Sequence, residues 1–145
     1  MEPYIHKVQY YETDRMQVTH HSNYVRFMEE ARVSYLSRIG WDYKRMEAEG
    51  IISPVVEISC KYRKTTTFED VISVEIYVKE VSSVKLKLGY RMKTEDQLVF
   101  TAESVHCFLN KEGAPINLKK ELPGFYETLL SLKESSVVSG SYFAK

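Results

Sequence analysis

Asp14 and His21 stand seven residues apart, just ahead of a segment with helical periodicity. Carboxylates and imidazoles commonly transfer protons in enzymes, and carboxylates also attack carbonyl carbons. The segment 24–39 repeats its apolar residues at helical spacing and follows Ser22 and Asn23, which are both good N-cap residues. We therefore expect Asp14 on a loop and His21 at the start of the helix.

A helix N-terminus adds to this chemistry, because its first backbone N–H groups are unpaired and carry partial positive charge. A carbonyl oxygen that gains negative charge can be stabilised there, which favours acyl transfer. Spacing alone leaves a second interpretation open, in which Asp14 ends a turn and His21 is a capping or surface residue. Glu12 is another candidate carboxylate, ranked below Asp14 because it lies close to the strand expected over residues 4–11, where it would be solvated or paired.

Composition limits the partners of the chain. A length of 145 residues is typical of one domain, and we assign residues 1–133 to it. The 20 basic and 20 acidic residues cancel, so neither nucleic acid nor an anionic membrane surface is an expected partner. No apolar run reaches membrane-spanning length and the first residues lack the apolar core of a signal peptide, so a cytoplasmic protein is expected.

The two cysteines are expected to be reduced, buried thiols. Cys60 and Cys107 lie in segments with strand patterns and form no CxxC motif. Cys107 adjoins His106, but neighbours on a strand point to opposite faces, which argues against a Cys–His catalytic pair. The histidines form neither an HxxxH nor an HExxH motif, so no metal site is expected.

After the helix, alternation of apolar and polar residues indicates strands over residues 52–63, 72–79, 84–93 and 98–109. Short turns join most of them, which favours an antiparallel meander of half-buried strands, with Pro54 marking an edge or a bulge. A second helix is expected over residues 119–132 and a loosely ordered tail over 134–145. The fold class is therefore α+β. One helix covers one face only, so the uncovered face and edges favour a homo-oligomer.

An aspartate loop followed by H-x-N-Y at the start of a central helix is a specific combination. The residues that carry it are Tyr11, Thr13, Asp14, Val18, His21, Asn23, Tyr24, Phe27, Glu30, Ala31 and Arg32, followed later by the stretch 102–108 and Pro115. In these residues the chain resembles the hotdog-fold acyl-CoA thioesterases of the 4-hydroxybenzoyl-CoA thioesterase type, including the YbgC-like branch. The resemblance implies an antiparallel sheet wrapped around a long central helix.

The resemblance also implies roles for site residues. Asp14 would act on a thioester as nucleophile or as general base for water. His21 and the backbone N–H groups of Ser22, Asn23 and Tyr24 match the region that receives the thioester carbonyl, although Asn23 and Tyr24 equally suit capping and packing. Gln17, a further candidate substrate contact, stands where the family often has glycine. Glutamine adopts glycine's backbone angles only with strain, so the shape of this loop stays open.

The implied activity is hydrolysis of an acyl-CoA to a free acid and coenzyme A, with coenzyme A as part of the substrate and no cofactor. Lys61, Arg63 and Lys64 are candidate contacts for its phosphates. The family's site lies between two subunits, which implies a homodimer or a homotetramer. Two alternatives share the fold: an acyl-carrier-protein thioesterase, and a non-catalytic acyl-CoA-binding protein. The sequence does not identify the acyl group.

Overall fold

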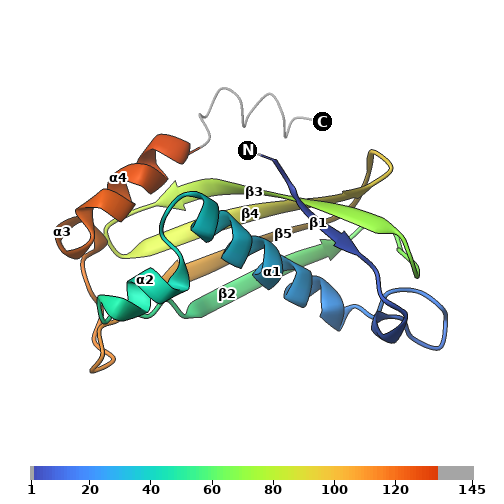
Figure 1. The fold of residues 1–145 in the computed structure, drawn as a ribbon, viewed down its shortest axis with the longest axis horizontal. Helices are drawn as coiled ribbons and strands as arrows, with labels where there is room; N and C mark the ends of the chain where they lie inside the picture. Colours follow the sequence, from blue (N-terminus) through green and yellow to red (C-terminus); the bar gives the residue numbers. More distant parts are fainter. Residues whose placement is uncertain (1, 134–145) are drawn as a thin grey trace.

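The computed structural model describes residues 2–133, which form a five-stranded antiparallel sheet with one long helix lying across it (Figure 1). The strands are β1 Tyr4–Lys7, β2 Val55–Tyr62, β3 Val71–Val81, β4 Lys85–Thr94 and β5 Gln97–Cys107. The helices are the 3-10 turn η1 Tyr10–Glu12, then α1 Ser22–Arg38, α2 Tyr43–Ala48, α3 Leu118–Glu121 and α4 Pro123–Leu132. The expected α+β class is confirmed, while the tail expected over 134–145 lies outside the described residues.

Helix α1 forms where the periodicity predicted it, because one face buries Phe27, Met28 and Leu36 almost completely. Burial of each such side chain contributes roughly 1.5–3 kcal/mol. The helix starts at Ser22, as expected, but its N-cap residue is His21, whose own side chain makes no capping bond. At the other end Gly40 takes a φ of +86°, and the chain folds Trp41 back onto the last turn.

The order of strands in the sheet is β1-β3-β4-β5-β2, so the expected four-strand meander is wrong at its first member. Strands β3, β4 and β5 do follow one another through short turns. Strand β2 instead pairs with β5, with Tyr62 opposite Phe100, and β1 takes the edge of β3. Strand β5 is thus paired along both of its edges, with β4 on one side and β2 on the other.

Strand β2 is the edge strand at the far side of the sheet, and the expectation that it is half-buried is wrong for the single chain. Val55, Val56 and Ile58 are 41, 53 and 37% exposed, and Tyr62 is 50% exposed although its ring contacts Tyr24 and Phe100. The interpretation of Pro54 is confirmed, because β2 begins directly after it and carries a register shift between Val55 and Glu57. Within residues 2–133, the outer edge of this apolar strand therefore has no neighbouring strand.

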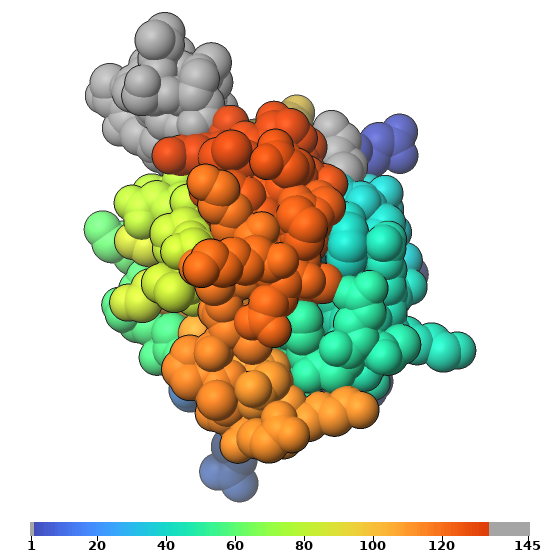
Figure 2. Space-filling model, turned by 90° about the vertical axis from the view of Figure 1, so that its left-hand side faces the viewer, coloured from blue at the N-terminus to red at the C-terminus, as the bar shows by residue number. Residues whose placement is uncertain are grey.

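Two segments differ from their expected form. The first strand ends at Lys7 instead of continuing to residue 11, and the chain turns through η1. The expected helix 119–132 is broken into α3 and α4, because Pro123 has no N–H and disfavours helical angles at Leu122. Figure 2 shows α3 and α4 covering one end of the sheet, with α2 beside them.

A chain of buried polar side chains crosses the core beneath α1. The Arg32 guanidinium donates to the Tyr90 hydroxyl (3.1 Å), which shares a hydrogen bond with Ser104 Oγ (2.6 Å), and Ser104 Oγ lies 2.7 Å from His106 Nε2. All four residues are buried. Burial, with a smaller contribution from the Arg32 charge, lowers the pKa of His106 to about 4. His106 is therefore neutral in the folded chain near neutral pH.

This burial predicts an acid-sensitive fold. In the unfolded chain His106 takes up its proton near pH 6.5, whereas the folded chain resists protonation until about pH 4. Stability is therefore full above pH 6.5 and falls as the pH drops toward 4, by about 3 kcal/mol for this residue alone. Urea unfolding at pH 7.5 and pH 5 would measure it, with His106→Asn as the comparison.

The variant removes the titrating group. The difference in free energy of unfolding between wild type and His106→Asn should therefore become about 2 kcal/mol smaller when the pH is lowered from 7.5 to 5. Carboxylates titrate equally in both proteins and cancel in this difference. Two parallel pH profiles would contradict the prediction.

Candidate active site

Asp14 opens a tight turn in a small hairpin that leads from η1 into α1. The Asp14 N–H donates to the Val18 carbonyl (2.9 Å), and the Gln17 N–H donates to the Asp14 carbonyl (2.9 Å). One carboxylate oxygen of Asp14 accepts the Met16 N–H (2.8 Å), and the side chain is half-buried. The loop position expected from the sequence is confirmed, and the second carboxylate oxygen has no partner within residues 2–133.

Gln17 takes a φ of +65°, in the left-handed region that favours glycine. For a residue with a side chain this conformation costs about 1–2 kcal/mol. The strained residue is held in place, because its carbonyl accepts a hydrogen bond from Thr67 Oγ1 (2.6 Å). The question left open by the sequence is thus answered: the hairpin takes glycine-type angles at Gln17 and is attached to the loop 63–70.

A buried group of hydroxyls lies under this hairpin. The Thr19 N–H donates to the Thr66 carbonyl (2.8 Å), and the two threonine hydroxyls lie 2.6 Å apart. The Tyr24 hydroxyl lies 2.9 Å from Thr66 Oγ1, and its ring stacks on Phe100. Burial raises the pKa of Tyr24. In the single chain Tyr24 therefore packs in the core, one of the two roles that the sequence left open.

The backbone at the start of α1 is more fully paired than the sequence suggested. Ser22 N–H donates to His20 Nδ1 (3.2 Å), Asn23 N–H to the His20 carbonyl (3.0 Å) and Tyr24 N–H to the His21 carbonyl (3.3 Å). The expectation that these groups are unpaired is wrong. Among residues 2–133 the N–H of His21 has no acceptor, so the donor open to a ligand lies one residue before the helix.

The His21 side chain is exposed and stacks on the ring of His20, with 4.3 Å between the ring centroids. Its carbonyl accepts the Tyr62 hydroxyl (3.0 Å), which links the end of β2 to the start of α1. No hydrogen bond or ion pair joins His21 to Asp14 within the described part of the chain. The two predicted residues therefore share one segment without forming a hydrogen-bonded pair.

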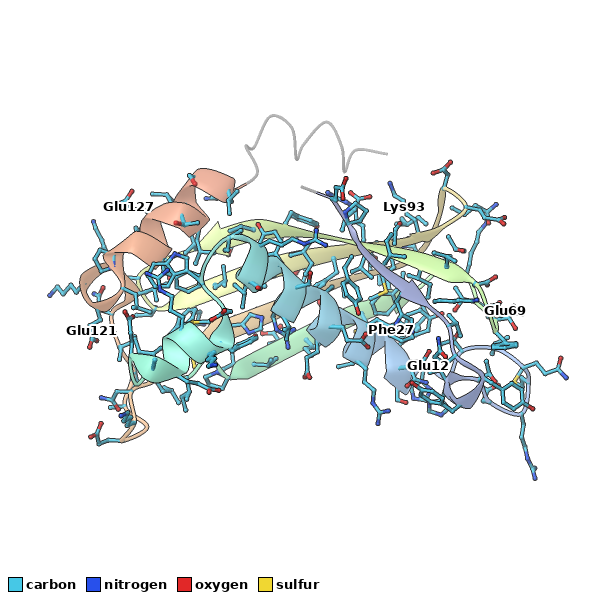
Figure 3. The ribbon with its side chains drawn as sticks, viewed as in Figure 1. Glu12, Phe27, Glu69, Lys93, Glu121 and Glu127 are labelled. Atoms are coloured by element: carbon cyan, nitrogen blue, oxygen red, sulfur yellow. The ribbon has the colours of Figure 1, made fainter. Side chains whose placement is uncertain are left out.

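Glu12 is paired, which is one of the two outcomes expected from its place near the first strand, and it is also buried. It is only 5% exposed, and one carboxylate oxygen lies 2.8 Å from His6 Nε2 and accepts the Gln9 N–H at 2.8 Å. Its backbone carbonyl accepts Asn23 Nδ2 (2.9 Å), which buries the Asn23 side chain. Figure 3 labels Glu12 and Phe27, the residues on either side of the His6 ring. Periodicity gave no signal for this, because η1 interrupts the strand pattern.

Three basic residues predicted to contact phosphate lie at and after the end of β2. Lys61, Arg63 and Lys64 are all exposed. Arg63 Nε donates to Thr101 Oγ1 (3.2 Å), and Lys64 Nζ donates to Gln97 Oε1 (3.4 Å). The chain continues from them into the loop 63–70 that holds the Asp14 hairpin. Their position leaves the charged groups at the surface, on the same end of the molecule as the start of α1 (Figure 1).

Other candidate sites are weaker. A cavity of about 380 Å³ lies between α2 and α4, with Trp41, Ile51 and Leu122 among its lining residues, at the end of the molecule away from Asp14. Its ionisable lining residues, Glu49 and Glu121, are exposed. Within residues 2–133 no three His, Cys, Asp or Glu side chains are grouped to hold a metal ion. None of the helices in that range has the length and apolarity that a membrane crossing requires.

Comparisons with known proteins identify the family and the fold of the chain. Residues 8–129 match the family model described as the thioesterase-like superfamily. Over 122 residues the chain is 31% identical to YneP of Bacillus subtilis, named as a candidate acyl-CoA thioesterase, with 83% of this chain and 88% of that protein covered.

Two solved structures are similar over most of their length. The hypothetical protein TT1821 from Thermus thermophilus has a TM-score of 0.84 at 33% identity, covering 91% of this chain and 99% of that one. The DHNA-CoA thioesterase from Staphylococcus aureus has a TM-score of 0.85 at 27% identity, covering 99% and 95%. The family resemblance read from the Asp14 loop and the H-x-N-Y run is thus confirmed, and the chain belongs to the thioesterase-like hotdog family.

Proposed function

We propose that this protein hydrolyses an acyl-CoA thioester to a free acid and coenzyme A. The observation that carries the proposal is the hairpin that presents the Asp14 carboxylate and leads, through an unpaired His21 N–H, into helix α1. The family supports a thioester substrate, and a coenzyme A thioester is named for the similar staphylococcal enzyme.

Asp14 has two chemically balanced routes. As a nucleophile, its free oxygen attacks the thioester carbon and expels the coenzyme A thiolate; water then opens the mixed anhydride and restores the carboxylate. As a general base, it takes a proton from water while the water oxygen attacks, and the departing thiolate receives that proton. Both routes place negative charge on the carbonyl oxygen.

The group proposed to stabilise that charge is the His21 N–H, which would donate a hydrogen bond to the carbonyl oxygen and stands at the positive end of the α1 dipole. His21 and Ser22 are exposed and are proposed to contact the thioester, and Gln17 to contact the arm of the substrate. Asn23 and Tyr24 are buried, and they are proposed to stabilise the backbone around the site through their bonds to Glu12 and Thr66. Coenzyme A phosphates are proposed to bind at Lys61, Arg63 and Lys64, where Arg and Lys match phosphate chemistry.

The proposed active form is a homodimer joined through the edge of β2. A bare edge with exposed Val56 and Ile58 is a template for pairing with a second copy, and pairing would cover both its backbone and its apolar side chains. The Tyr62 hydroxyl, at the end of β2, donates a hydrogen bond to the His21 carbonyl, so β2 would take part in both the proposed interface and the proposed site.

Asp14→Asn tests the reaction. The amide oxygen of asparagine still accepts the Met16 N–H, so the hairpin should keep its shape while hydrolysis falls by about 10²- to 10⁴-fold. A thiol-reactive dye measures coenzyme A release from short, long and aromatic acyl-CoAs. Asp96→Asn, at an exposed residue of the β4–β5 turn, is the matched control and should remain active.

Full turnover by Asp14→Asn would overturn the role of Asp14. A wild-type protein that binds acyl-CoA yet releases no thiol from any of them would instead be a binding module.

Ile58→Lys tests the dimer. A lysine on the exposed inner row of β2 places like charges against each other when two edges pair, so light scattering should report the mass of one 16.9 kDa chain instead of two. Thiol release should fall with the loss of the dimer. Ser59→Lys, on the opposite face of the same strand, is the control. A wild type that is monomeric yet fully active would contradict the prediction.

A further inference from the structure

We propose that the hydrogen-bonded pair of half-buried His6 and buried Glu12 positions the hairpin 13–19, and with it Asp14, at the start of α1. As a claim about catalysis this rests on the proposed function of Asp14. Neither His6 nor Glu12 is proposed to touch the substrate, so both would act through the hairpin.

Glu12 is the residue at which four segments of the chain meet. Its carboxylate bonds to His6 on β1 and to the N–H of Gln9 before η1, both at 2.8 Å. Its backbone carbonyl accepts the N–H of His20 (2.8 Å) from the returning arm of the hairpin and Nδ2 of Asn23 (2.9 Å) from α1. The side chain and the main chain of one residue thus hold β1, η1, the hairpin and α1 together.

The burial of Glu12 makes the His6 bond necessary. A carboxylate withdrawn from water is costly unless hydrogen-bond donors replace the lost water. Within residues 2–133 no lysine or arginine forms an ion pair with Glu12, and its donors are the Gln9 N–H and His6. Loss of the His6 donor would therefore favour movement of Glu12 toward solvent.

The His6 ring is itself fixed from the side of α1. It lies on the Phe27 ring with 4.1 Å between centroids, and Nδ1 is 3.5 Å from a carboxylate oxygen of Glu30. The same oxygen accepts the Tyr4 hydroxyl (2.7 Å). The ring therefore connects α1 to Glu12, so that the position of Glu12 depends on the position of α1.

Both groups of the proposed reaction lie close to Glu12 along the chain. Asp14 is two residues after it, and His21 directly follows His20, whose N–H binds the Glu12 carbonyl. A shift of Glu12 would displace the carboxylate relative to the carbonyl donor. Misplacement by about 1 Å is enough to lower a rate by roughly 100-fold.

His6→Phe is the central variant, because phenylalanine keeps a ring on Phe27 and removes the donor to Glu12. We expect kcat to fall by about 10- to 100-fold while KM changes by less than about threefold. His6→Gln carries an amide N–H near the position of Nε2 and should restore much of kcat. Glu29→Gln is the control: it removes an exposed carboxylate from the same helix and leaves the contacts of the His6 ring in place, so its kcat should stay near wild type.

A second measurement does not need turnover. Hydrogen–deuterium exchange of peptides covering residues 9–21 should accelerate in His6→Phe and return toward wild type in His6→Gln, with β4 and β5 unchanged. If the wild type hydrolyses acyl-CoA and His6→Phe matches it in both kcat and exchange, this proposal fails and the proposed function stands.

If the wild type hydrolyses no acyl-CoA, the proposed function fails and exchange alone decides: local acceleration over 9–21 supports the positioning role, and its absence overturns it. Acceleration spread over the whole chain, with a matching loss of thermal stability, would also overturn it, since the pair would then be a general stabilising contact.

Discussion

Helix α1 must bury a face made of Tyr24, Phe27, Met28 and Leu36, and the inner face of the sheet is the surface that accepts it. This burial sets where the N-terminus of the helix lies. The hairpin before the helix and the loop 63–70 after β2 then reach the same end of the molecule. There Thr19 bonds to Thr66 and Gln17 to Thr67, although some fifty residues separate the members of each pair in the sequence. The rest of the candidate site follows from that meeting.

The candidate site consists mainly of backbone groups. The side chains beneath it form hydrogen bonds that keep this backbone in place. Thr66, Thr67 and Tyr62 each donate or share a hydrogen bond with the segment from residue 17 to residue 24. Among residues 2–133, the second carboxylate oxygen of Asp14 and the N–H of His21 have no hydrogen-bond partner. A reactive carboxylate gains from such support because less reorganisation is needed when charge develops nearby.

Periodicity predicted α1 and the β3–β5 meander, since the buried residues of α1 recur at helical spacing and those of β3 and β5 fall mainly on one face. Periodicity did not predict the position of β2 in the sheet. The pairing of β2 with β5 depends on the path of the loop that connects β2 to β3, and the alternation of apolar and polar residues does not record that path. The break at Pro123 was readable from proline chemistry alone. In the site, the Asp14 loop was predictable. The pairing of the Ser22 N–H with His20 Nδ1 was not, nor was the burial of Glu12, because both depend on turns that bring neighbouring residues back together.

Gln17 also matters before the chain folds. Glycine has more backbone freedom to lose than any other residue, and the first glycine in this sequence is Gly40. The unfolded segment that becomes β1, η1, the hairpin and α1 therefore samples fewer conformations than one with glycine at position 17 would. A side chain there lowers the entropic cost of ordering the hairpin by about 0.4–1 kcal/mol, which offsets part of the left-handed strain. The net cost of glutamine at this turn is therefore smaller than its left-handed backbone angles alone would indicate.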